Sequence, residues 1–215
     1  MNSLIITDRG NRRVVRWSRE SGTVRGEILL DGIDCHSLAL DNERYLYVSD
    51  DQKHEVRRYQ LSREAGINSK QGTLIAGGNM WGSNLNELFV PTYIFFDGQQ
   101  AVYVSDTWNH RVMKWNRGAQ EGIVVAGGQG FGSALTQLAR PRGLFVDSSG
   151  NVYVAEQENH RVTRWPREAK EGTVVVDGNG EGAKQFSYPR GLSFDRQRNL
   201  YVVDHWNHRV QRFSI

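Results

Sequence analysis

The sequence of 215 residues contains no long apolar run, and no segment approaches the roughly 18 apolar residues that a membrane-spanning helix needs. Its first residues, MNSLIITDRGNRRVV, lack the basic start, apolar block and small-residue cleavage site of a secretory signal. We therefore expect no membrane partner and, by default, a cytoplasmic location. Cys35 is the one cysteine, which excludes an internal disulfide framework and a zinc site built on cysteines.

Prolines are also few, and the net charge is small. There are four prolines, and Lys and Arg together outnumber Asp and Glu by only 27 to 24. Modules that bind nucleic acids usually concentrate basic charge more strongly, so the composition gives such a role little support. Glycine, in contrast, is frequent, and its 23 residues recur at regular positions. This regularity indicates an internal repeat.

A motif centred on a valine occurs five times. The five segments are GNRRVVRW (10–17), QKHEVRRY (52–59), WNHRVMKW (108–115), ENHRVTRW (158–165) and WNHRVQRF (206–213). Their central valines are 42, 56, 50 and 48 residues apart, which is close to the period of propeller repeats. In every copy an acid precedes the valine by six residues, and a base and an aromatic follow it by two and three. Fixed offsets within variable intervals predict a rigid unit joined by loops of variable length.

Each complete unit contains four short strand candidates separated by turn signals. In the third unit they are YIFFD (93–97), VYVSD (102–106), RVMKW (111–115) and GIVVA (122–126). They are rich in β-branched and aromatic residues, and no segment shows a helical period of useful length. Repeated groups of four antiparallel strands are the pattern of a β-propeller. We predict one all-β propeller domain with units at about 1–31, 32–77, 78–127, 128–177 and 178–215.

The NHRV segments at 109–112, 159–162 and 207–210 resemble NHL repeats, as do the strands VYVSD, VYVAE and LYVVD before them. The resemblance covers almost the whole chain. It implies a β-propeller, commonly of six blades, that often forms the substrate-recognition part of larger proteins such as TRIM-type ubiquitin ligases. This chain has no RING or B-box cysteine pattern, so it performs no ligase chemistry itself.

The second unit departs from the motif. It has Lys53, His54 and Glu55 where the repeat has Asn-His-Arg, and Cys35 where other units have proline. We therefore expect its blade to be the most irregular one.

The strand count along the chain is three, four, four, four and three. The first unit begins at its second strand and the last stops after its third, so the terminal units do not complement each other. We expect five visible blades of a six-bladed propeller whose upstream sequence is missing, with a distorted five-bladed ring as the alternative. Unclosed blades would favour self-association.

The repeated polar residues are expected to build the ring. Histidines on different blades cannot share one metal ion, whose ligands lie about 2.1 Å away. We expect them to pack the turn between the second and third strands, and the acids to accept backbone N–H groups of that turn. We expect the repeated arginines to form ion pairs with acids. In the second unit Glu55 stands in place of the arginine, so this ion pair should be missing there. The residues assigned to this structural role are Asp8, Asp50, Asp106, Glu156, Asp204, His110, His160, His208, Arg111, Arg161 and Arg209.

Function is then expected among residues that do not repeat. The turns between second and third strands share one face of a propeller with the turns that enter the inner strand, and exposed tryptophan with arginine is frequent at interaction hot spots. The alternative is that these tryptophans wedge between blades. The predicted binding face comprises Tyr93, Trp108, Arg142, Gln157, Arg190, His205 and Trp206.

Three functions are compatible with this face. The leading hypothesis is a non-catalytic scaffold, without cofactor, that binds a protein or peptide. The second is RNA binding through Arg142, Arg190 and Lys53, which added salt would weaken steeply. The third is a zinc enzyme similar to the peptidyl-hydroxyglycine lyases, which build their site on an NHL-like propeller. Only His36 and His205 lie outside the repeat and could serve such a site.

Overall fold

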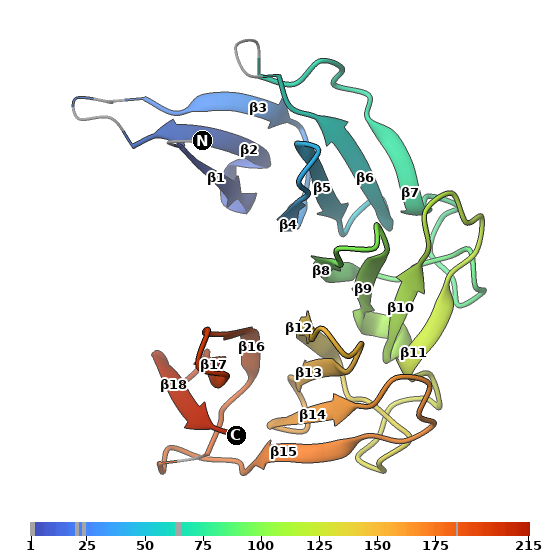
Figure 1. The fold of residues 1–215 in the computed structure, drawn as a ribbon, viewed down its shortest axis with the longest axis vertical. Helices are drawn as coiled ribbons and strands as arrows, with labels where there is room; N and C mark the ends of the chain where they lie inside the picture. The colour runs from blue at the N-terminus through green and yellow to red at the C-terminus, as the bar shows by residue number, and fades with distance from the viewer. Residues whose placement is uncertain (1–2, 20–21, 23–24, 63–65, 184) are drawn as a thin grey trace.

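The computed structural model describes residues 3–19, 22, 25–62, 66–183 and 185–215, and over these residues it forms eighteen strands and two single-turn 3-10 helices. The strands make five separate antiparallel sheets. The sheets stand around a central axis as the blades of a propeller (Figure 1). The predicted all-β propeller is therefore confirmed, including the count of three, four, four, four and three strands.

The blades follow one another along the chain. Blade 1 contains β1 (Ser3–Asp8), β2 (Arg13–Ser18) and β3 (Glu27–Asp31), with η1 (Arg9–Asn11) between its first two strands. Blade 2 contains β4 (Cys35–Leu40), β5 (Tyr45–Asp50), β6 (Glu55–Gln60) and β7 (Thr73–Gly77). Blade 3 contains β8 (Pro91–Phe96), β9 (Val102–Asp106), η2 (Thr107–Asn109), β10 (Arg111–Trp115) and β11 (Ile123–Gly127). Blade 4 contains β12 (Pro141–Val146), β13 (Val152–Glu156), β14 (Arg161–Trp165) and β15 (Thr173–Asp177). Blade 5 contains β16 (Pro189–Phe194), β17 (Asn199–Asp204) and β18 (Arg209–Ser214).

The inner strands of blades 2 to 5 begin two residues earlier than the sequence pattern indicates. Pro91 pairs with Asp106 and Pro141 with Glu156, so each proline is the first residue of its strand. That position tolerates proline, which has no N–H to donate to a ladder. Cys35 pairs with Asp50 in the same register. The expectation that blade 2 would be irregular is therefore wrong for its strand pairing, since the register tolerates either residue at this position.

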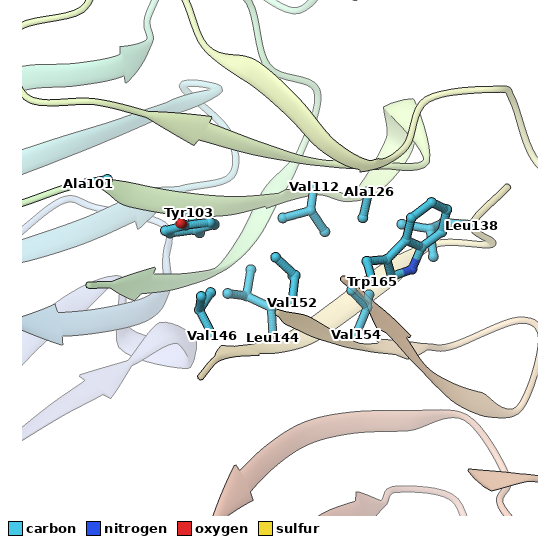
Figure 2. Packing of buried hydrophobic residues seen from close by; sticks show 10 residues of the cluster. All are labelled: Ala101, Tyr103, Val112, Ala126, Leu138, Leu144, Val146, Val152, Val154 and Trp165. Carbon is cyan, nitrogen blue, oxygen red and sulfur yellow. The ribbon is translucent and has the colours of Figure 1, made fainter. Parts of the chain in front are cut away.

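The hydrophobic core is divided into layers between neighbouring blades. Each blade presents one face of its sheet to the blade before it and the other to the blade after it, so strands such as β9 are buried on both faces. Figure 2 shows the layer between blades 3 and 4, in which side chains of both sheets meet. Its members are Ala101, Tyr103, Val112, Ala126, Leu138, Leu144, Val146, Val152, Val154 and Trp165.

The repeated valine shows how much a blade depends on its neighbour. Val162 and its counterparts in blades 1 to 3 are completely buried, whereas Val210 in blade 5 is 62% exposed. On the other side of the ring, Ile6 in β1 is 39% exposed, although its counterparts in blades 2 to 5 are completely buried. Blades 1 and 5 lie on either side of the opening in the ring (Figure 1). Their outward faces thus retain the apolar residues of a blade interface.

Over the described residues, the structure contains no helix that is both long and apolar enough to cross a membrane.

Candidate functional site: a basic cluster at the ring axis

Each inner strand of blades 2 to 5 carries a β-bulge directly after its first residue. The register shifts between Cys35 and Leu38, and at the same point of β8, β12 and β16. A bulge inserts one extra residue and re-aims the local side chains. The bulged pairs are residues 36–37, 92–93, 142–143 and 190–191. Blades 4 and 5 both carry Arg-Gly at these positions, whereas blade 2 has His-Ser and blade 3 has Thr-Tyr, so the ring presents different side chains at its axis from different blades, with an arginine from two of them.

Contacts between non-neighbouring blades show that these side chains point to the axis. The guanidinium Nη1 of Arg142 in blade 4 lies 3.4 Å from Nε2 of His36 in blade 2. Between them in the chain stands Tyr93 of blade 3, whose ring packs edge-on against that of His36 at 5.3 Å. We call His36, Tyr93, Arg142, Gln157 and Arg190 the central cluster.

A second series of non-repeated side chains lies beside the bulges. It occupies the position directly after each repeated acid, where β5, β9, β13 and β17 end. Arg142 Nε donates to Oε1 of Gln157 at 2.5 Å, and the hydroxyls of Thr92 and Thr107 lie 2.7 Å apart. The members of the series are Arg9, Asp51, Thr107, Gln157 and His205.

Arg142 and Arg190 form a pair of cations without a carboxylate partner in the part of the chain that the structure describes. The ion pairs among the described residues include neither of them. The Nε of Arg190 is buried, and no described residue accepts a hydrogen bond from it. Burial, followed by the charge of Arg190, lowers the pKa of Arg142 to about 10. The guanidinium of Arg142 therefore remains charged at neutral pH, and the charge of Arg190 repels it.

A glycine beside Arg142 lets the two inner strands that carry these arginines approach. Gly143 follows Arg142 in the bulge of β12, and a Cβ at this position would collide with the carbonyl oxygen of Arg190. The inner strands β12 and β16 can therefore lie side by side only because residue 143 has no side chain. Gly191 is less constrained, since a Cβ there would make a tight contact with Val203 of the same blade at 3.3 Å and an ordinary contact with the hydroxyl of Tyr93 at 3.6 Å.

The histidines near the axis are neutral. Burial, then the charge of Arg142, lowers the pKa of His36 to about 4. Burial, then Arg190, also lowers the pKa of His205. The Nδ1 atoms of both are buried without a hydrogen-bond partner in the described part of the chain. The positive charge of the site thus comes from arginine alone.

The two predicted tryptophans are exposed, in the turns that follow β9 and β17, and Trp108 contacts Arg140 of the segment that leads into blade 4. Trp206 is 62% exposed and stacks on Tyr188, with 4.9 Å between ring centroids. Trp108 is 44% exposed, and the guanidinium of Arg140 lies over its ring at 4.6 Å. The predicted binding residues therefore fall into two groups, one at the axis and one at the rim. The tryptophans that do pack between blades are the buried Trp115 and Trp165.

Two further exposed aromatics on this face were missed from the sequence. Trp81 and Phe131 occupy equivalent positions in the glycine-rich segments GGNMWG (77–82) and GGQGFG (127–132), and both are about 60% exposed. The ring of Trp81 packs against that of Phe89, which in turn packs against the ring of Trp108. They could have been found from the sequence, because each is an aromatic residue in a loop of small residues that contributes no strand to the core.

The repeated acids organise their own blades. Arg111 Nε donates to Asp106 at 2.7 Å, and Arg161 and Arg209 make the same contact with Glu156 and Asp204. The expected bonds to the following turn occur at Asp50, which accepts from the N–H groups of Gln52 and Lys53. Asp106 and Asp204 instead accept the N–H of a residue that precedes the inner strand of the same blade. The expectation was incomplete, because the segment that leads into the inner strand supplies a backbone N–H that is nearer to the acid than those of the turn.

Glu55 changes this network in blade 2. It bonds to Arg57 at 2.8 Å instead of contacting the acid of its own unit. The Oδ2 of Asp50 is consequently buried without a hydrogen-bond partner in the described residues, and the Lys53 ammonium is 3.8 Å away. Asp8, in blade 1, retains its pair with Arg13 at 2.7 Å.

The repeated histidines connect one blade to the next. His110 Nδ1 accepts the N–H of Arg140 at 3.2 Å, and His54 and His160 accept those of Val90 and Tyr188. This extends the expected packing of the turn, because the partner belongs to the following blade. His208, in blade 5, is exposed, and no described N–H donates to it.

The chemistry available elsewhere is limited. Among the described residues, no three His, Cys, Asp or Glu side chains are grouped closely enough to hold a metal ion. A groove of about 1200 Å³ lies between blades 3 and 4, lined by Asp97, Asp147 and Arg167. Asp97 and Asp147 follow the inner strands β8 and β12, whereas the central cluster lies where these strands begin.

Comparisons with known proteins agree with this architecture. The NHL repeat family model matches residues 138–165 and 186–213, and no curated protein sequence matches the chain. An auxiliary nutrient binding protein from Bacteroides thetaiotaomicron is similar in structure, with 18% identity and a TM-score of 0.72 over 99% of this chain and 56% of that one. A chain of a nidogen/laminin complex has 18% identity and a TM-score of 0.73 over 98% of this chain and 73% of its own. A gluconolactonase from Xanthomonas campestris has 17% identity and a TM-score of 0.70 over 93% of this chain and 65% of its own. This chain spans little more than half of the nutrient binding protein, and such identities show a shared fold alone.

Proposed function

Since this chain is an NHL-repeat β-propeller, we propose that it is a non-catalytic scaffold that binds a protein or peptide on the face around the ring axis. The observation that carries the proposal is the separation of roles on this face. The side chains of the repeated acids, arginines and histidines are used within and between blades, whereas those of Trp108, Trp206, Arg142 and Arg190 make none of these repeated contacts.

The composition of the face suits a macromolecular partner. Exposed tryptophans at the rim supply large apolar contact area, and half-buried arginines at the centre supply directed hydrogen bonds. The nidogen/laminin complex and the nutrient binding protein show that similar propellers occur in binding proteins. In a longer protein, this chain would serve as the substrate-recognition part, as expected for a ubiquitin-ligase-type protein.

A sixth blade belongs to the same proposal. The exposed Ile6 and Val210 occupy positions that are completely buried in the other blades, so both sides of the opening match the faces of an NHL-type blade. A sixth blade would cover them and close the ring. A second copy of the chain meeting these faces would be the self-association expected from the sequence.

Selection from a peptide display library tests the binding function. We expect a selected peptide to lose at least about tenfold in affinity to Trp206→Ala, the change typical of a hot-spot tryptophan. Fluorescence anisotropy with a labelled peptide measures the loss. Ile123→Ala is the matched control, because Ile123 is 54% exposed but lies on the outer strand β11. Its effect should stay within about twofold.

Two results would contradict this proposal. One is that no peptide is enriched, and the other is that both variants weaken binding equally. An RNA pool screened in parallel distinguishes the main alternative, because binding through phosphates falls steeply between low and physiological salt.

A further inference from the structure

One arginine near the ring axis is neutralised by a carboxylate of the protein itself. Arg9 of blade 1 donates to Asp51 of blade 2 at 2.6 Å, and the Asp51 side chain is only 3% exposed. Both residues occupy the position directly after the repeated acid of their blade. A carboxylate at this position can therefore reach and neutralise a guanidinium at the mouth of the ring.

Blades 4 and 5 have neutral residues at the same position. Gln157 and His205 stand where blade 2 has Asp51. The amide oxygen of Gln157 accepts one hydrogen bond from Arg142, but it does not balance the charge of Arg142 or Arg190. Like charges close together and partly removed from water repel each other more strongly than at an open surface. An anion between the two arginines would remove this repulsion.

The geometry favours a planar anion. Arg142 already directs its Nε to a planar carbonyl group, that of Gln157, at 2.5 Å. The Nε of Arg190 is buried and has no acceptor in the described residues, so its hydrogen-bonding capacity is not used within the protein. Guanidinium groups bind carboxylates through paired hydrogen bonds. Tyr93 closes the site from blade 3 and carries a hydroxyl that can donate to the same ligand.

We infer that the central cluster binds a carboxylate, which an acidic side chain of the protein or peptide partner brings to Arg142 and Arg190. This inference rests on the proposed function and assigns its chemistry at the axis. The rim tryptophans would contact the same partner outside the axis.

A titration followed by nuclear magnetic resonance tests the site directly. The probes are acetyl-Gly-Glu-Gly-amide, its Gln counterpart, sodium acetate and inorganic phosphate, added to the full chain. We expect the Glu peptide and acetate to shift the Nε–Hε signals of Arg142 and Arg190, and the Gln peptide to leave them unchanged. Arg190→Gln should reduce the affinity for the Glu peptide about tenfold or more, as the loss of a hydrogen bond to a charged group does.

Matched variants separate the site from general charge. Arg167→Gln also removes one positive charge, but its side chain is 73% exposed in the loop between β14 and β15, so its effect should stay below about twofold. Arg190→Lys keeps the charge and loses the fork, so we expect an intermediate loss. Thermal unfolding of each variant confirms that it is folded.

Three outcomes would overturn the inference: equal binding of the Glu and Gln peptides, equal losses in Arg190→Gln and Arg167→Gln, or a response to phosphate without a response to either carboxylate. These titrations do not use the selected peptide. A failed selection with a positive titration would thus contradict the proposed function alone, whereas the reverse would contradict only the carboxylate site.

Discussion

His54, His110 and His160 accept a backbone N–H from the next blade, whereas His36 and His205, outside the repeat, lie beside the central arginines. The sequence distinguished the two groups, because histidines at one repeated position lie on different blades and cannot build one asymmetric site. It did not identify the acceptor role of the repeated histidines, since the donor lies about 30 residues downstream, in another blade.

The first prediction concerns the hydrogen bond between a repeated histidine and the backbone of the next blade. His110→Ala should destabilise the protein by about 1–2 kcal/mol, because the N–H of Arg140 loses its acceptor. His208→Ala is the control, since His208 has nearly the same positive φ but is exposed and receives no described N–H. Urea denaturation of both variants measures the difference. Equal losses would show that the effect comes from backbone strain and not from the bond.

At the scale of strands and blades, the sequence placed the strands well because local pattern determines them. Alternating and β-branched residues form the strands, and glycine-rich turns end them. The bulges of β4, β8, β12 and β16 could not be predicted, because a bulge is defined by pairing with another strand. Yet these bulges carry His36, Tyr93, Arg142 and Arg190, so the site depends on a feature that no single segment reveals.

The second prediction concerns the free energy that the packing between blades contributes to stability. Val162→Ala should cost about 2 kcal/mol, because two buried methyl groups are lost from the layer between blades 4 and 5. Val210→Ala, at the same position of a face that blade 5 leaves open, should change the free energy of unfolding by less than about 0.5 kcal/mol. Chemical denaturation at low protein concentration provides the comparison. If both substitutions are equally costly, the face of blade 5 is covered in solution.

For the whole molecule, the histidines predict an acid-sensitive ring. Burial is the largest cause that lowers the pKa of His36, His54, His110 and His205 below 6.5. Above pH 6.5 these groups are neutral in both the folded and the unfolded chain, so their contribution to stability is constant there. Below it the unfolded chain takes up protons first, and stability falls. For His36, whose pKa is about 4, the loss approaches about 1.4 kcal/mol per pH unit.

Denaturation midpoints at pH 7.5 and 5.0 check this prediction, with the lower value expected at pH 5.0. His36→Gln should reduce the difference between the two midpoints, since one titrating group is removed. A midpoint that does not change over this range would contradict the assignment of neutral histidines at the axis.

The sequence by itself determined the repeat, the blades and the residues that build them, because strand formation and turn chemistry act within each unit. It also selected most of the candidate site, since Tyr93 and Gln157 occur in one blade only, and Arg142 and Arg190 in two. Only the tertiary structure decided which of these side chains meet. Arg142 and His36 are 106 residues apart and lie on blades that are not neighbours. They meet because the curvature of the ring and the bulges of its inner strands direct both toward one axis.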